Sequence, residues 1–115
     1  MQWQVCIVII YLFYFEITRM DNLDYLTGTV KKAEQRVRVG SFYTHYRDNE
    51  KLKLYKVLAI AINEEDDQPC VVYQALYGDG LIWVRAVSVW CDAIEYNGQI
   101  YPRFILYEQK NLSGD

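Results

Sequence analysis

Short β-favouring segments separated by turn residues fill most of the chain, and this spacing constrains the fold more than any other feature of the sequence. The strongest turn signal is Asn97-Gly98, because these residues readily adopt the positive φ angles of a two-residue hairpin. Strands are predicted over 42–46, 54–62, 70–76 and 81–87, and on both sides of the hairpin turn at 94–96 and 99–101. We therefore expect a mostly β chain that forms a small SH3-like barrel or roll of five to six short antiparallel strands.

Two of these segments carry a signal for their place in the sheet. Apart from Lys56, Leu54 to Ile62 is apolar at both odd and even positions, as expected for a central strand that is buried on both faces. Pro102 has no N–H to donate to a neighbouring strand, so we expect the last predicted strand to lie at an edge.

The residues before the first predicted strand have a different character. Leu23, Leu26 and Val30 have roughly helical spacing. Gly28 and Thr29 interrupt that spacing, so we expect a short helix or an irregular lead-in. The expected organisation is an apolar extension over 1–19, a polar lead-in over 20–39, a β-roll domain over 40–108 and a flexible tail over 109–115.

The N-terminal extension contains an uninterrupted apolar run from Val5 to Phe15, which is shorter than the roughly 20 residues of a membrane-spanning helix. No Lys or Arg precedes it and no small-residue cleavage site follows, so a secretory signal is not expected. Three interpretations stay open: a strand or helix added to the core, a weakly membrane-associating segment, or residues upstream of a start at Met20. We favour the last, because Met20-Asp21-Asn22 is typical of a polar N-terminus and no turn signal connects the run to the rest.

Charge and cysteine content bear on partners and location. A formal net charge of -3 argues against sequence-independent nucleic-acid binding, which depends on an excess of Lys and Arg. A basic cluster and an acidic run are both expected to be solvated surface: Lys31, Lys32, Arg36 and Arg38, and Glu64, Glu65, Asp66 and Asp67. Cys6, Cys70 and Cys91 are too widely spaced for a structural zinc site, and they fit structural thiols in a reducing compartment. We expect a cytoplasmic protein that does not bind membranes.

Four short motifs occur in order after Gly40. They are Tyr43-Thr44-His45-Tyr46-Arg47, Tyr73-Gln74-Ala75-Leu76-Tyr77-Gly78-Asp79, Trp83-Val84-Arg85 and Pro102-Arg103-Phe104. Together they resemble domain-of-unknown-function family 1653, whose pattern runs Y-x-H-Y-K, Y-x-A-L-Y-G, W-V-R-P and P-R-F. The resemblance covers about Gly40 to Tyr107 and implies a small bacterial β-roll, with no established activity. The sequence departs from the pattern at Ala86, where the family usually has Pro, and at Trp90, where Phe is common.

Alternation within the motifs places polar and aromatic residues together. Tyr43, His45 and Arg47 share one face of an extended strand, and one of the two faces must belong to the core. Trp83 and Arg85 likewise share a face, where a guanidinium group can lie on an aromatic ring or bind a carboxylate or phosphate.

A structural role for the arginines is the alternative. Arg85 or Arg103 could pair with Asp79 as a buried brace, because a desolvated charge needs a partner. The turn Tyr77-Gly78-Asp79-Gly80 lacks the features of a phosphate loop and is predicted to be a tight turn. With His45 as the only histidine, neither a metal site nor a cofactor is expected.

Three functions are compatible with these features. The first is a module that binds a small anionic or nucleotide-like ligand, with Tyr43, His45, Tyr73, Asp79, Trp83, Arg85 and Arg103 as the candidate site. The second is a protein-interaction module whose aromatic groove includes Trp83 and Trp90.

The third is a small hydrolase or transferase with His45 as base, Arg85 as anion holder and Ser88, Cys70 or Cys91 as nucleophile. We rank it last and lean against an enzyme, because no nucleophile signature is present. A homodimer contact through a tyrosine-rich edge is a further alternative.

Overall fold

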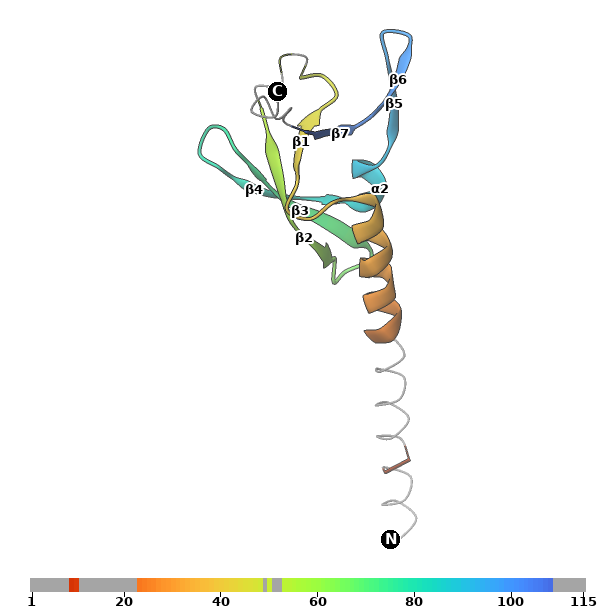
Figure 1. The fold of residues 1–115 in the computed structure, drawn as a ribbon. Coiled ribbons are helices and arrows are strands. Elements are labelled where there is room, and N and C mark those ends of the chain that lie inside the picture. Colours follow the sequence, from red (N-terminus) through yellow and green to blue (C-terminus); the bar gives the residue numbers. More distant parts are fainter. Residues whose placement is uncertain (1–8, 11–22, 49, 51–52, 109–115) are drawn as a thin grey trace, which may run out of the picture.

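The structure is a computed structural model that describes residues 9–10, 23–48, 50 and 53–108. Its strands form two antiparallel sheets (Figure 1). The first sheet has the order β4-β3-β2-β1-β7 and consists of β1 (Phe42–His45), β2 (Tyr55–Ile62), β3 (Pro69–Ala75), β4 (Ile82–Ala86) and β7 (Phe104–Tyr107). The second is the hairpin of β5 (Ala93–Tyr96) and β6 (Gln99–Pro102), and the single-turn helix α2 (Val87–Trp90) connects β4 to β5.

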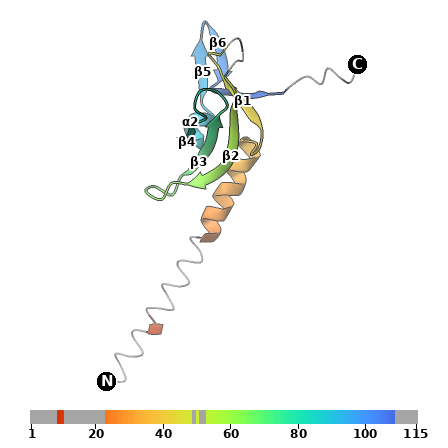
Figure 2. The ribbon, with the colours of Figure 1, turned by 90° about the vertical axis from the view of Figure 1, so that its left-hand side faces the viewer.

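The predicted mostly β fold is confirmed, with seven strands where five to six were expected. Within the described residues the first sheet stays open, since its edge strands β4 and β7 do not pair with each other, and it does not close into a barrel. The additional strand arises because the chain changes sheets at Arg103: β6 pairs with β5, whereas β7 pairs with β1. The curvature of β2 and β3 is visible in Figure 2.

The central position predicted for β2 is confirmed, but its burial on both faces is wrong. Val57 is fully buried, whereas Leu58 and Ala59 are exposed. A register shift between Val57 and Ala59 interrupts the regular alternation, and the second face of the sheet is open to solvent there. The edge position of Pro102 is confirmed, because β5 is the only strand that pairs with β6 in the described part of the chain.

A helix occupies residues 23–36, so the lead-in is helical and the interruption expected at Gly28 and Thr29 does not occur. The Thr29 hydroxyl donates a hydrogen bond to the carbonyl one turn earlier, and a helical glycine costs only about 1 kcal/mol relative to alanine. Ala33 and Val37, four residues apart, are both buried at the C-terminal end of the helix. Figure 1 shows that the other end extends away from the sheet.

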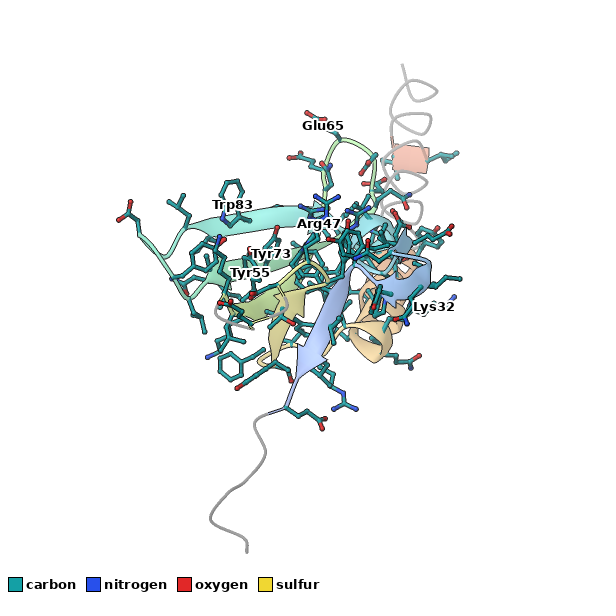
Figure 3. The ribbon with its side chains drawn as sticks, turned by 90° about the horizontal axis from the view of Figure 1, so that it is seen from above. Lys32, Arg47, Tyr55, Glu65, Tyr73 and Trp83 are labelled. Carbon is teal, nitrogen blue, oxygen red and sulfur yellow. The ribbon has the colours of Figure 1, made fainter. Side chains whose placement is uncertain are left out.

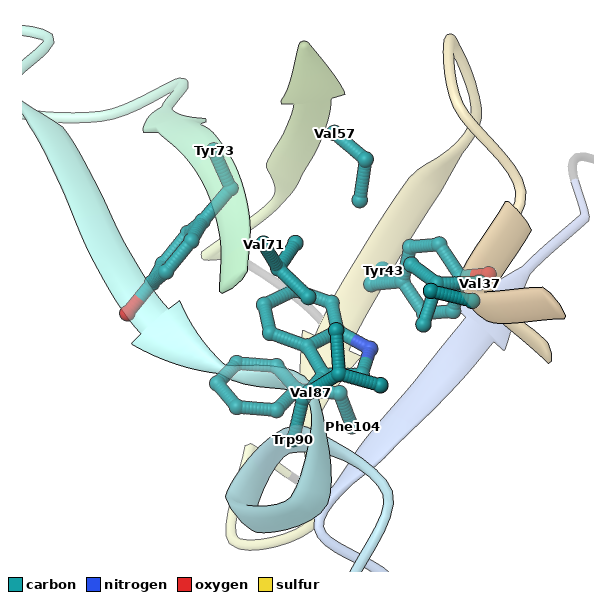
Figure 4. Close-up of a cluster of buried hydrophobic side chains, with 9 residues drawn as sticks. Val37, Tyr43, Val57, Val71, Tyr73, Val87, Trp90 and Phe104 are labelled. Carbon is teal, nitrogen blue, oxygen red and sulfur yellow. The ribbon is translucent and has the colours of Figure 1, made fainter. Parts of the chain in front are cut away.

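An aromatic cluster forms the centre of the core (Figure 4). The rings of Trp90 and Phe104 stack with centroids 3.8 Å apart and planes 5° from parallel. Tyr43 and Tyr73 meet the Trp90 ring edge-on, at 5.3 and 4.9 Å. Since Trp90 comes from α2 and Phe104 from β7, this cluster joins the short helix to the last strand of the sheet.

Several expectations concern segments that the structure covers little or not at all. Of the apolar extension over 1–19 only Ile9 and Ile10 are described, as exposed helical residues, and the tail over 109–115 lies outside the described residues. No helix among the described residues is long and apolar enough to cross a membrane. The basic cluster and the acidic run are exposed, as predicted.

Candidate functional site

One face of the five-stranded sheet carries most of the predicted site residues. His45 is paired with Phe104, Tyr43 with Tyr55, and Tyr73 with Trp83. Directly paired residues of antiparallel strands point to the same side of a sheet, as do residues two apart on one strand. Following these rules from strand to strand gives one set of residues, here named the aromatic face: Tyr43, His45, Tyr55, Tyr73, Trp83, Arg85 and Phe104.

The aromatic face runs from the core to the solvent. Tyr43 and Tyr73 are buried, His45, Tyr55 and Arg85 are half-buried, and Trp83 is exposed at the edge strand β4. Figure 3 shows Trp83, Tyr73 and Tyr55 near one another across three neighbouring strands. Solvent therefore reaches the face at Trp83 and around the half-buried residues.

Arg85 lies on the ring of Phe104, with its guanidinium carbon 5.4 Å from the ring centroid. Because Trp90 stacks on one side of that ring, the guanidinium group takes the other. Among the described residues, no carboxylate lies within ion-pair distance of Arg85. The His45 ring meets the same Phe104 ring edge-on at 5.5 Å, so Arg85 and His45 flank one aromatic ring.

The surroundings of His45 favour its neutral form. Burial lowers the pKa of the imidazole from its ordinary 6.5, and the guanidinium groups of Arg85, Arg103 and Arg47 lower that pKa further, while Asp48 acts in the opposite direction. Nδ1 of His45 accepts a hydrogen bond of 3.3 Å from the backbone N–H of Arg47. At neutral pH the ring is therefore uncharged, with an acceptor nitrogen already engaged.

A cleft of about 290 Å³ adjoins the aromatic face at His45 and Tyr55. Its lining residues are His45, Arg47, Asp48, Lys53, Tyr55 and Tyr77. The hydroxyl groups of Tyr55 and Tyr77 share a hydrogen bond of 2.7 Å. Burial raises the pKa of Tyr55 above its ordinary value, and this hydrogen bond raises it further. The Asp48 carboxylate accepts a hydrogen bond of 2.8 Å from the backbone N–H of Lys53. Asp48 keeps its negative charge, and the two cationic side chains of Arg47 and Lys53 outnumber it in the lining of the cleft.

Arg103 is held by the protein itself. Its Nε donates a hydrogen bond of 3.0 Å to the carbonyl of Val89, and its guanidinium group lies 3.8 Å from the carboxylate of Asp92. The buried brace with Asp79 that the sequence suggested is therefore not formed: Arg103 pairs with Asp92, whose side chain is 52% exposed. Asp79 is exposed in the turn between β3 and β4, where the flanking Gly78 and Gly80 have the predicted positive φ angles.

The predicted site residues therefore differ in their exposure and in whether they lie on the aromatic face. His45, Trp83 and Arg85 share the aromatic face at positions that solvent reaches, whereas Tyr43 and Tyr73 belong to the core. The hydroxyl group of Tyr43 accepts a hydrogen bond of 2.9 Å from the backbone N–H of Arg38, as expected for a structural tyrosine. Asp79 and Arg103 do not lie on the face.

The proposed place of Trp90 in a surface groove is wrong. Its side chain is only 2% exposed and is packed between aromatic rings. The cause is α2, which turns the chain after β4 and directs Trp90 into the core.

Six residues of the aromatic face and the cleft were missing from the candidate site predicted from the sequence: Arg47, Asp48, Lys53, Tyr55, Tyr77 and Phe104. Arg47 stands within the first quoted motif. Phe104 and Tyr77 stand within the quoted motifs, and that was the available signal for them. Tyr55 was assigned to an apolar strand, and nothing in its sequence context indicated that its hydroxyl group would meet that of Tyr77. Lys53 had no signal, since its position beside the cleft depends on the path of a loop.

No group of three His, Cys, Asp or Glu side chains that could hold a metal ion occurs in the described ranges. Cys70 is buried and Cys91 half-buried, and burial raises the pKa of both thiols, so both are protonated near neutral pH.

The family of the chain follows from comparison with known proteins. A family model described as a protein of unknown function, DUF1653, matches residues 41–106. The chain belongs to the DUF1653 family. The crystal structure of a DUF1653 protein from Bordetella bronchiseptica is similar, with 29% sequence identity and a TM-score of 0.50, over 61% of this chain and 87% of that one. No curated protein matches the chain.

The matched region of the DUF1653 family contains the whole aromatic face and the cleft. It begins after Ala33 and Val37, so the buried end of the N-terminal helix lies outside the family match and nevertheless contributes to the core. The resemblance inferred from the four motifs is confirmed at the level of the family.

Proposed function

We propose that this DUF1653 domain is a binding module for a small anionic ligand with a planar, nucleotide-like part. The observation that carries the proposal is the guanidinium group of Arg85, which is half-buried on Phe104 without a carboxylate partner among the described residues. A buried or half-buried charge that the protein leaves unpaired is well suited to a carboxylate or phosphate supplied by a ligand.

The surroundings of Arg85 support both parts of such a ligand. Arg47 and Lys53 in the cleft add positive charge, which attracts an anion. The half-exposed indole of Trp83 and the ring of Tyr55 offer surfaces on which a planar group can stack. In contrast, Arg103 is already occupied by Val89 and Asp92, so we assign it a structural role.

The test is a comparison of AMP, adenosine and inorganic phosphate by thermal shift and isothermal titration calorimetry. We expect AMP to raise the melting temperature at millimolar concentration, because a ligand that binds only the folded state stabilises it. Adenosine and phosphate are expected to bind more weakly, since each lacks one half of the recognised group. No response to any of the three would reject the proposal.

Arg85→Gln tests the residue that carries the proposal, and Arg36→Gln is its matched control on the exposed surface of the helix. Loss of one charge-assisted contact corresponds to about 1.5–3 kcal/mol, so we expect AMP to bind Arg85→Gln at least about tenfold more weakly. Arg36→Gln should bind AMP like the original chain. Equal weakening in both variants would show a general charge effect and contradict a site at Arg85.

The two other functions have less support. A peptide-binding groove would have to rely on Trp83 alone among the two tryptophans considered, because Trp90 is in the core. For catalysis, none of Ser88, Cys70 and Cys91 forms a hydrogen bond with His45 in the described part of the chain.

A further inference from the structure

The edge strand β4 and the residue before it carry an exposed apolar surface, of which the proposed ligand site uses only Trp83. Leu81, Ile82, Trp83 and Val84 are 57, 60, 49 and 64% exposed. Ile82 and Val84 alternate with Trp83 and Arg85, so they lie on the opposite side of the sheet from the aromatic face. Four consecutive exposed apolar residues are unusual on the surface of a small soluble domain.

The backbone of β4 also has hydrogen-bonding groups that point away from the sheet. Ala75 donates a backbone hydrogen bond of 2.9 Å to the carbonyl of Leu81. In an antiparallel pair the groups of successive residues point alternately toward the neighbouring strand and away from it. The register with β3 continues without a shift, so the N–H and C=O groups of Ile82 and Val84 point outward.

In the described part of the chain, the first part of this edge lacks the usual protections against pairing with another strand, and the one charge of β4, Arg85, lies near its end and on the aromatic face. Between Asp79 and Arg85 there is neither a charged residue nor a proline, and β4 has no bulge. At the other edge of the sheet, Ile105, Leu106 and Tyr107 of β7 are half-buried and Glu108 follows them. β4 therefore combines exposed apolar side chains with backbone N–H and C=O groups that point away from the sheet.

We propose that β4 pairs in antiparallel orientation with β4 of a second copy of this chain, with Trp83 on the two-fold axis. In a two-fold antiparallel pair, β4 of one copy lies beside β4 of the other. The side chains of the strand must therefore pack well against those of an identical strand. In this register Ile82 lies opposite Val84 of the second copy, and their outward N–H and C=O groups bond to each other. The two Trp83 side chains meet as a cross-strand aromatic pair, which is a favourable combination.

The neighbouring registers are less favourable. With Val84 on the axis, Ile82 lies opposite Ala86 and the apolar contact shrinks. With Ile82 on the axis, Val84 lies opposite Gly80, which has no side chain to contact. Centring on Trp83 gives the largest apolar overlap and places no charged residue opposite a charge of the same sign.

The experiment measures the mass of the full chain over a range of concentrations by sedimentation velocity and light scattering. We expect a reversible increase from the chain mass of 13.6 kDa to twice that value. Val84→Lys adds a charge at the outward edge and should raise the dissociation constant at least tenfold. Ile100→Lys makes the same kind of change at a residue that is 76% exposed on β6, and it should leave dimerisation unchanged.

Val84→Pro is a second variant that addresses the backbone directly. It removes an outward N–H that makes no bond to β3, so the monomer keeps its sheet while the dimer loses hydrogen bonds. Hydrogen exchange of the Ile82 and Val84 amides should slow as the concentration of the original chain rises. Either a monomer at every concentration, or a dimer that Val84→Lys and Val84→Pro leave intact with fast exchange at both amides, overturns the proposal. Since the dimer brings the two Trp83 side chains together, AMP binding is measured with Val84→Lys, which keeps every side chain of the aromatic face. Failure of dimerisation is thereby distinguished from failure of AMP binding.

Discussion

Trp83 and Trp90 lie close together in the sequence and in opposite environments in the structure. Trp90 is almost completely buried against Phe104, whereas about half of Trp83 is exposed. The sequence suggested both residues as surface contacts, because a large aromatic side chain suits a binding site as well as a core. The burial of each tryptophan determines how much its replacement lowers the free energy of unfolding.

We expect Trp90→Ala to lower the free energy of unfolding by about 3–5 kcal/mol, because it leaves a large cavity and removes a stacked ring. Trp83→Ala should cost less than about 1 kcal/mol, as is usual for an exposed position. Urea denaturation of both variants, followed by circular dichroism, checks this prediction. Similar losses in the two variants would contradict the packing described for α2.

His45 gives the stability a pH dependence whose sign follows from its surroundings. Burial and three neighbouring arginines lower the pKa of the folded state below 6.5, the ordinary value expected in the unfolded chain. Between the two pKa values the unfolded chain binds more protons than the folded chain. Lowering the pH through this range therefore lowers the free energy of the unfolded chain relative to the folded one. The stabilisation is complete above pH 6.5 and is lost as the pH falls through the folded-state pKa.

His45→Gln should remove this contribution. We expect the difference in unfolding free energy between the original chain and His45→Gln to decline as the pH falls below 6.5, while it stays constant above that value. Chemical denaturation at a series of pH values measures the difference. A difference that grows on acidification would mean that His45 is stabilised in its charged form.

At the scale of elements, the turns were the most predictable part of the structure. Asn97 and Gly98 have φ angles of 53° and 76°, as the hairpin signal indicated, and they join β5 to β6. The helix over 23–36 contains another glycine, Gly28, with ordinary helical geometry and open space around it. Replacement by alanine is therefore expected to lower the stability at Gly98 and to raise it at Gly28.

Gly98→Ala should destabilise the hairpin by about 1–2 kcal/mol, because a side chain at positive φ is strained. Gly28→Ala should stabilise the helix by up to about 1 kcal/mol, since alanine is a better helix former. Thermal denaturation of both variants measures whether each melting temperature rises or falls. A lower melting temperature for Gly28→Ala would show that this part of the helix is not formed in solution.

Local signals predicted most strand positions, and alternation predicted that Trp83 and Arg85 share a face. The pairing of β7 with β1 could not be predicted, because it depends on packing between residues about sixty positions apart. The four-residue helix α2 is too short to show a helical period. For the same reasons the contact of Arg85 with Phe104, which defines the candidate site, was absent from the sequence analysis.

At the scale of the whole molecule, the core extends beyond the segment that the family model matches. Val37 is completely buried and Ala33 nearly so, and both precede residue 41. The last turn of the N-terminal helix and the sheet consequently share one apolar interior. We expect them to unfold together.

Val37→Ala should lower the free energy of unfolding of the full chain by about 2 kcal/mol, because it removes two buried carbon atoms and leaves a cavity. Leu23→Ala, at the exposed part of the helix, should change it by less than about 0.5 kcal/mol. Helical circular dichroism and tryptophan fluorescence should follow the same urea transition in each variant. Two separate transitions would show that the helix is an independent appendage.

The stacking of Phe104 on Trp90 also has a consequence for the order of events during protein synthesis. The chain is synthesised from its N-terminus at about 5–20 residues per second, and it leaves the ribosome in that order. Helix, hairpins and α2 emerge while Trp90 still lacks the ring that covers it, and β1 lacks the strand that completes its pairing. The native packing around Trp90 therefore cannot be complete until Phe104 has left the exit tunnel.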